Sequence, residues 1–236
     1  MITKRETALN NINAGWAKCH LWSDELKNDD ELMKLACLQS IQNLEFASNR
    51  LRNDKPFLIK MFRVHKGRRY SYSHQDNAIR IIEFASNDLK DDTDFMKLAI
   101  SYDERLIKYA NERLIHDISF ILTVMKNNID VYYELPLSMK REKELALYAA
   151  KNNVNIEDMP SEVKSDKEIV LACINQIHEA YHSYWVLPKD MQEDPEILKL
   201  YLYKITENLD DSSVELPYHV VQVLMEKAGI QEKNFA

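Results

Sequence analysis

A phrase of eleven residues recurs along this chain, and it constrains the fold more than any other feature. It reads LEFASNRLRND at residues 44–54 and IEFASNDLKDD at residues 82–92. A repeated unit of this size cannot bury its own apolar side chains, so consecutive units have to stack on one another. The phrase therefore predicts a repeat protein, and it predicts shape rather than chemistry.

The repeat can be followed from an apolar residue, here called the anchor, that precedes an acidic turn. Successive anchors are 25, 38, 25, 25, 24 and 28 residues apart. An acidic residue follows each anchor by three positions, and apolar residues follow it by six and by ten. The anchors are Leu26, Leu51, Leu89, Leu114, Met139, Val163 and Met191.

This pattern predicts one helical hairpin in each unit. The acidic residue at the turn can cap the second helix, because its carboxylate accepts backbone N–H groups that lack an intrahelical partner. Cation binding by the repeated carboxylates is the alternative, but one carboxylate at each helix start does not converge on one ion. Residues three or four apart favour a first helix that runs through Leu44, Ala47, Ser48 and Leu51.

The sequence shows no sustained alternation of polar and apolar residues, so no sheet is expected. The predicted fold is all-α, an α-solenoid of about seven to eight short helical hairpins with a period near 25 residues. We expect a single domain, 1–236. In it, residues 1–25 form an N-terminal cap, 26–205 form the repeats with an insertion near 63–76, and 206–236 form a C-terminal cap and tail.

The phrase Phe-Ala-Ser-Asn-x-Leu-x-x-Asp resembles the repeats of the family called domain of unknown function 4116 (DUF4116). The matching residues are 46–54 and 84–92, with 109–117 a weaker copy and 169–172 similar to the second helix of that family. The resemblance covers roughly residues 20–200 and is strongest in the first half. It implies short stacked helical hairpins in bacterial, phage or protist proteins, and it implies no catalytic residues.

The composition excludes several classes of function. Only three glycines are present, Gly15, Gly67 and Gly229, so neither a phosphate-binding loop nor a dinucleotide fingerprint can form. The net charge of −7 argues against nucleic acid as the default partner. Three cysteines without metal-type spacing indicate reduced, buried thiols. The sequence contains no apolar run typical of a signal peptide or of a membrane span, so a cytoplasmic protein that does not contact a membrane is expected. No cofactor is expected.

A basic stretch interrupts the acidic pattern where the anchor spacing is 38. Residues 63–74 carry four basic residues, two tyrosines and two histidines, and no acidic residue. Insertions in repeat proteins project as loops and often lie on the binding face. We therefore expect contact with an acidic protein surface; a solvated loop without a partner and contact with nucleic acid are the alternatives. The predicted contact residues are Arg63, Lys66, Arg68, Arg69, Tyr70 and Tyr72.

Residues 178–182 match the H-E-x-x-H motif of zinc peptidases. On a helix, His178 and His182 would lie one turn apart on one face and could share a zinc ion, with Glu179 as the general base. The third ligand is unassigned, with Glu193, Glu196 and Glu207 as the candidates, and no strand is predicted that would align a substrate. A polar helix face in a degenerate repeat is the simpler interpretation.

These observations favour a non-catalytic protein-binding scaffold, and the reach of the family into phages and bacteria suggests an inhibitor or adaptor acting on a host or defence protein. A zinc-dependent hydrolase at residues 178–182 and a nucleic-acid-binding protein using residues 63–74 are the alternatives. The sequence identifies neither the partner nor the oligomeric state.

Overall fold

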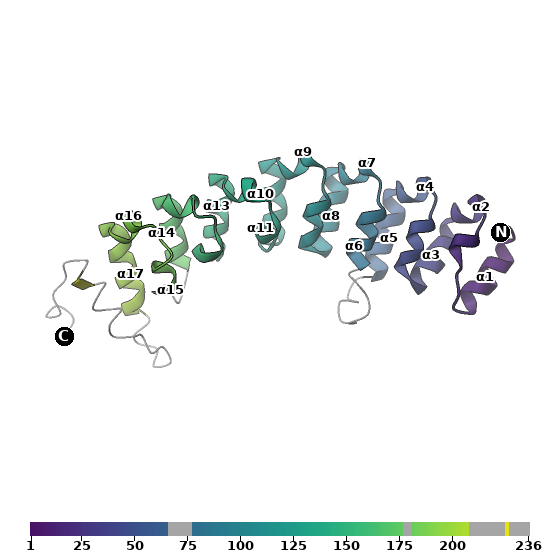
Figure 1. Cartoon of the computed structure of the whole chain (residues 1–236), viewed down its shortest axis with the longest axis horizontal. Coiled ribbons are helices and arrows are strands. Elements are labelled where there is room, and N and C mark those ends of the chain that lie inside the picture. Colours follow the sequence, from purple (N-terminus) through teal and green to yellow (C-terminus); the bar gives the residue numbers. More distant parts are fainter. Residues whose placement is uncertain (66–76, 177–180, 208–224, 227–236) are drawn as a thin grey trace. The chain divides into compact units, whose positions relative to one another are not determined.

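A computed structural model describes residues 1–65, 77–176, 181–207 and 225–226 of the chain (Figure 1). The described residues form mostly helix, and no strand is assigned among them beyond an isolated bridge between Ile2 and Trp22. The all-α prediction is therefore confirmed. None of the described helices is long and apolar enough to cross a membrane.

The chain divides into two compact units, Met1–Glu134 (unit 1) and Leu135–Ala236 (unit 2). The prediction of one continuous domain, 1–236, stays a prediction. The α-helices of unit 1 are α1 (Arg5–Asn13), α2 (Asp24–Lys27), α3 (Asp30–Gln39), α4 (Asn49–Arg52), α5 (Lys55–His65), α6 (Asn77–Phe84), α7 (Asn87–Lys90), α8 (Thr93–Tyr102), α9 (Glu112–Ile115), α10 (Ile118–Asn127) and α11 (Val131–Glu134). Its 3-10 helices are η1 (Cys19–Leu21), η2 (Ile41–Phe46) and η3 (Glu104–Tyr109).

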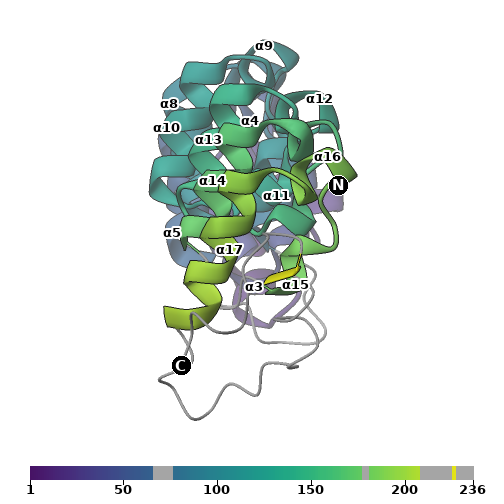
Figure 2. The same ribbon diagram turned by 90° about the vertical axis from the view of Figure 1, so that its left-hand side faces the viewer.

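In unit 2, longer and shorter helices lie on different sides. The α-helices are α12 (Leu137–Lys140), α13 (Lys143–Ala150), α14 (Lys167–Gln176), α15 (Tyr181–Tyr184), α16 (Lys189–Gln192) and α17 (Pro195–Glu207), and the 3-10 helices are η4 (Ile156–Asp158) and η5 (Val163–Ser165). Helix α14 packs against both α13 and α17. Figure 2 shows these three helices together on one side, with α12, α15 and α16 on the other.

The equivalent positions of the repeat form the core. Six anchors, from Leu26 to Val163, are buried, and only Met191 is half-buried. The residues six positions after the anchors are all buried, as are those ten positions after. The residues six positions after the anchors are Leu32, Phe57, Phe95, Phe120, Leu145, Ile169 and Ile197. The residues ten positions after the anchors are Ala36, Met61, Ala99, Val124, Ala149, Cys173 and Tyr201. The apolar pattern therefore marks the side chains that fill the interior.

Six of the seven acidic residues that follow the anchors cap the next helix, as predicted. The Asp54 carboxylate accepts the Phe57 N–H at 2.9 Å, and Asp92 accepts the Phe95 N–H at 2.7 Å. Asp29, Asp117, Asp166 and Asp194 make equivalent contacts. Glu142 makes no such bond.

The predicted first helix through Leu44 and Leu51 is wrong. The segment forms the 3-10 helix η2, becomes extended at Ala47 and Ser48, and then forms the single turn α4. Ser48 breaks the helix because its hydroxyl accepts the Leu51 N–H at 3.2 Å and so caps α4. The helical spacing of the apolar residues is satisfied by two short elements rather than by one helix.

Candidate functional site

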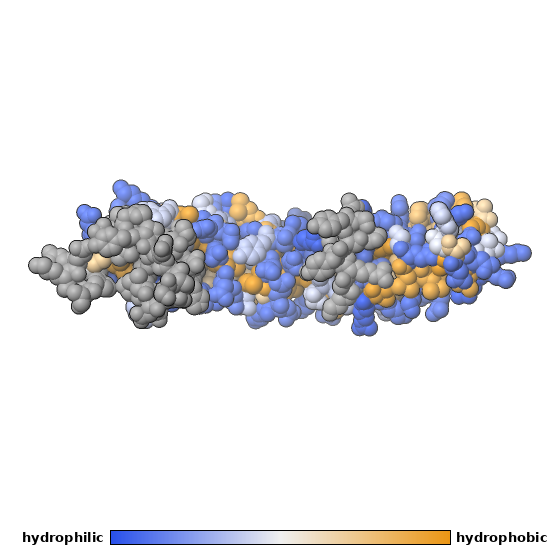
Figure 3. All heavy atoms as spheres, turned by 90° about the horizontal axis from the view of Figure 1, so that it is seen from below, coloured by the Kyte–Doolittle hydropathy of each residue, from blue (hydrophilic) through white to orange (hydrophobic). Residues whose placement is uncertain are grey.

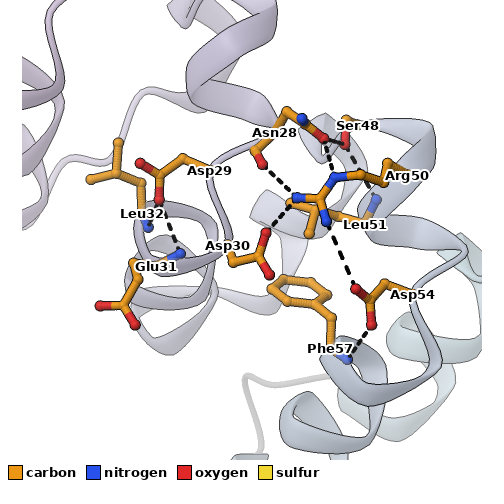
Figure 4. Close-up of polar contacts among 10 residues, drawn as sticks. All are labelled: Asn28, Asp29, Asp30, Glu31, Leu32, Ser48, Arg50, Leu51, Asp54 and Phe57. Atoms are coloured by element: carbon orange, nitrogen blue, oxygen red, sulfur yellow. Dashed lines mark hydrogen bonds and ion pairs between the residues drawn. The ribbon is translucent and has the colours of Figure 1, made fainter.

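The turns that join the short and long helices form a polar edge in unit 1. Each short helix together with the long helix that follows it, such as α2 with α3 and α4 with α5, is here called a hairpin. Figure 4 shows the first part of this edge, where Arg50 reaches back to the preceding hairpin. Its Nε donates to Asn28 Oδ1 at 2.7 Å and its Nη2 donates to the Asn28 carbonyl oxygen at 2.7 Å. Arg50 also forms ion pairs with Asp30 and, at 3.8 Å, with Asp54. One guanidinium therefore joins the turns of two hairpins.

The same contact recurs at another pair of hairpins. Arg113 Nε donates to Asp91 Oδ1 at 2.9 Å, and its Nη2 donates to the Asp91 carbonyl oxygen at 2.7 Å. Arg113 precedes its anchor by one residue, as Arg50 does. The arginines are thus equivalent in sequence and in the atoms that they contact.

Three backbone hydrogen bonds, here called the inter-hairpin backbone bonds, join successive hairpins of unit 1. In each bond, the donor is the amide of the residue three positions before an anchor. The acceptor is the carbonyl oxygen of the residue directly after the previous anchor. The bonds are Ser48 N–H to Lys27 at 3.0 Å, Ser86 N–H to Arg52 at 3.1 Å and Asn111 N–H to Lys90 at 2.9 Å. In unit 2 the donor position is held by Pro136, Pro160 and Pro188, which have no amide hydrogen to donate.

Ion pairs to the capping aspartates, here called the capping ion pairs, join hairpins in both units. Lys55 Nζ lies 2.8 Å from Asp92 Oδ1, Lys143 Nζ lies 2.8 Å from Asp166 Oδ2, and Lys167 Nζ lies 2.8 Å from Asp194 Oδ2. Each lysine follows its own anchor by four residues. In the latter two pairs the lysine hydrogen bond is the main cause that lowers the pKa of the carboxyl group, against the effect of burial.

Two shallow depressions flank α4 on this edge and share Asn49 and Asn53. The first is lined by Asn49, Arg50, Asn53, Asp54, Lys55 and Pro56. The second lies between α4 and α7 and is lined by Asn49, Arg52, Asn53, Glu83, Phe84, Ala85, Ser86, Asn87 and Lys90. The second depression combines two cations, an aromatic ring and several amide side chains.

Apolar side chains also reach the surface of both units. Trp16 and Leu21 in unit 1 are 70% and 42% exposed, and Trp185 and Tyr203 in unit 2 are 50% and 59% exposed. Seen from below in Figure 3, apolar residues gather beneath α3 and α5 of unit 1. Single exposed apolar residues are common on protein surfaces, whereas a contiguous patch favours a binding surface.

Most of the predicted contact residues cannot be placed. Arg63 is exposed near the end of α5, whereas Lys66, Arg68, Arg69, Tyr70 and Tyr72 lie outside the described residues. The prediction for this stretch is therefore untested.

The H-E-x-x-H motif is likewise untested. His178 and Glu179 lie outside the described residues, and His182 belongs to α15. Across the described part of the chain, no group of three His, Cys, Asp or Glu side chains is arranged to hold a metal ion.

The pattern of anchors does not predict that Arg52, Phe84 and Lys90 meet, and the structure brings them together at one depression. Arg52 and Lys90 hold the same place, one residue after the anchor, and Lys27 holds it in the first hairpin. A comparison of the polar positions between repeats would have shown these cations. Their proximity to Phe84 depends on how one hairpin joins the next.

The family model described as Domain of unknown function (DUF4116) matches residues 75–115. No curated protein and no solved structure matches the chain. The matched segment contains the anchor Leu89, the capping residue Asp92 and the inter-hairpin backbone bond from Asn111 to Lys90. The predicted resemblance is therefore confirmed for this segment, which is similar to that family.

Proposed function

We propose that this chain is a non-catalytic scaffold that binds another protein through the exposed side chains of an α-solenoid. The hairpins would repeat with a period near 25 residues within each unit. The observation that carries the proposal is the recurrence of the inter-hairpin backbone bonds in unit 1. Because main-chain atoms join the hairpins, exposed side chains can differ between repeats without loss of the joint.

The exposed side chains do differ between repeats. Arg50, Asp88 and Arg113 occupy the position before the anchor, are all exposed, and differ in charge. The buried positions six and ten residues after the anchor, by contrast, remain apolar throughout. A constant core with a variable surface is the arrangement through which stacked repeats recognise different partners.

The proposed partner is a protein with an acidic surface, and residues 63–74 are the proposed main contact. This stretch concentrates basic and aromatic residues in a chain whose net charge is −7, and arginine and tyrosine are enriched among residues that dominate binding energy. An inhibitor or adaptor would act in this way, by occupying a surface of its target. The buried, unpaired thiols Cys19, Cys37 and Cys173 support a reducing, cytoplasm-like compartment.

Co-purification from the native host, followed by mass spectrometry, tests this function. We expect the chain to retain a specific partner, and the variant Arg68→Glu/Arg69→Glu to lose it with an unchanged melting temperature. A matched variant, Lys60→Glu/Lys126→Glu, reverses two exposed charges on α5 and α10 and should keep the partner. Equal retention by all three proteins would disprove the assignment of residues 63–74, and no specific partner under any condition would contradict the scaffold function.

A further inference from the structure

The depression between α4 and α7 combines the side chains that an acidic peptide requires. Arg52 comes from the end of α4 and Lys90 from the end of α7, and Phe84 precedes α7. Asn49 and Asn53, from α4 and the residue after it, and Asn87, from the start of α7, also line the depression. All three asparagines are exposed, whereas Arg52, Phe84 and Lys90 are half-buried.

The inter-hairpin backbone bonds explain why these groups meet. The Ser86 N–H donates to the Arg52 carbonyl oxygen at 3.1 Å, and Phe84 precedes Ser86 by two residues. The Ser86 hydroxyl also donates to Asn53 Oδ1 at 2.5 Å. Arg52 is therefore held next to the segment that carries Phe84, which in turn leads into α7 and Lys90.

Both cations retain donors for a further partner. Arg52 donates from Nη2 to Asn49 Oδ1, and Lys90 donates from Nζ to the Glu83 carbonyl oxygen at 3.3 Å. Among the described residues, neither forms an ion pair with a carboxylate. Arginine has five N–H donors and lysine has three, so most of them remain available. The nearby Glu83 carboxylate is engaged by Arg80 Nη1 at 2.8 Å.

We propose that this depression is a docking site for an acidic, extended peptide segment of a partner protein. Carboxylates of the peptide would bind Arg52 and Lys90, and an apolar side chain between them would pack on Phe84. The asparagine amides both donate and accept, and so match a peptide backbone. The proposal rests on the scaffold function and adds a second contact, separate from residues 63–74.

Burial and charge both favour a carboxylate ligand. Burial lowers the pKa of Lys90, and a bound carboxylate would offset this by stabilising the ammonium. A nucleic acid fits less well, because Asp54, Glu83 and Asp88 lie on or near this edge and would repel a continuous phosphate chain. The chemistry therefore selects spaced carboxylates on a peptide.

Fluorescence anisotropy with a defined probe tests the site directly. The probe is a short fluorescein-labelled peptide of alternating Glu and Leu, and its control carries Gln in place of Glu. We expect the wild-type chain to bind the Glu peptide, and Arg52→Gln/Lys90→Gln to bind it about tenfold more weakly or worse. The matched variant Lys60→Gln/Lys126→Gln, which removes two exposed cations elsewhere in unit 1, should bind as the wild type does.

Four binding results would each overturn the proposal. They are no binding of the Glu peptide by the wild type, equal binding of the Gln peptide, full binding by Arg52→Gln/Lys90→Gln, and displacement by an oligothymidine of the same length. If light scattering shows a dimer that Arg52→Gln/Lys90→Gln dissolves, the occupant is a second copy and the proposal is again wrong. The two proposals can also be separated. If the chain captures a partner whose binding is lost only in Arg68→Glu/Arg69→Glu, and the Glu peptide does not bind, the scaffold function is supported and this docking site is disproved.

Discussion

Lys55 Nζ lies 2.8 Å from Asp92 Oδ1, and the same Asp92 oxygen accepts the Phe95 N–H at 2.7 Å. One carboxylate thus caps α8 and binds the preceding hairpin. Both partners are about one third exposed, so solvent screens the ion pair and the cap contributes more to stability.

Substitution of Asp92 separates these two contributions. Asp92→Asn keeps a capping oxygen and loses the ion pair, so we expect a loss of about 0.2–1 kcal/mol in the free energy of unfolding. Asp92→Ala loses both contacts, and we expect a total loss of about 1–2 kcal/mol. Urea denaturation followed by circular dichroism measures both, with Asp94→Asn, an exposed first-turn residue of α8, as the control. Equal losses for Asn and Ala would show that the ion pair, not the cap, dominates.

Acid should weaken unit 2 through its capping ion pairs. The lysine partners hold the pKa of Asp166 and Asp194 below the ordinary value of 3.8. A carboxyl group with a lower pKa in the folded state stabilises the fold above its unfolded pKa, and this stability is lost as the pH falls through the folded value. We expect the urea midpoint to fall as the pH decreases below 3.8, and Asp194→Asn to reduce that dependence. An unchanged pH profile in Asp194→Asn would argue against the pair.

The capping ion pairs suggest a stabilising substitution. Thr93 holds the same place after its anchor as Lys55, Lys143 and Lys167, and Asp117 is the next capping residue. Thr93→Lys should pair with Asp117 and raise stability by about 0.2–1 kcal/mol, less at high salt. Thr93→Gln supplies the length without the charge and should not gain. A melting temperature that rises equally for Lys and Gln would contradict the ion pair.

Hydrogen exchange can detect the inter-hairpin backbone bonds. The amides of Ser48, Ser86 and Asn111 precede very short helices, yet they donate to the preceding hairpin. We expect their exchange to be slow, because it requires separation of two hairpins rather than fraying of one turn. The amide of Asn49, an exposed residue at the start of α4, gives a reference for fast exchange by NMR. Exchange of all four amides at one rate would disprove the bonds.

The three thiols should be inert in the folded chain. Burial raises the pKa of Cys19, Cys37 and Cys173 to about 12, and the thiolate is the form that reacts. We expect no labelling by a thiol reagent near neutral pH and complete labelling in urea. Rapid labelling of one cysteine in the native state would show that its part of the core is open.

The sequence predicted the core and the caps because both depend on local spacing. The buried series from Leu32 to Ile197 and the capping aspartates were found by position alone. The break at Ser48 was missed, because apolar residues three or four apart fit both one helix and two short elements. The group of Arg52, Phe84 and Lys90 could not be predicted, since it forms only when two hairpins join.

The joint between hairpins also bears on how such a chain could change in evolution. In unit 1 part of the joint is made by main-chain atoms, and a duplicated or deleted hairpin could form that part with its new neighbour whatever its side chains. In unit 2, the donor position is held by Pro136, Pro160 and Pro188, which lack the amide hydrogen that this bond needs. There the lysine and the aspartate of each capping ion pair have to be inherited together, Lys143 with Asp166 and Lys167 with Asp194. Unit 1 is therefore the part in which whole modules can be gained, lost or exchanged most freely.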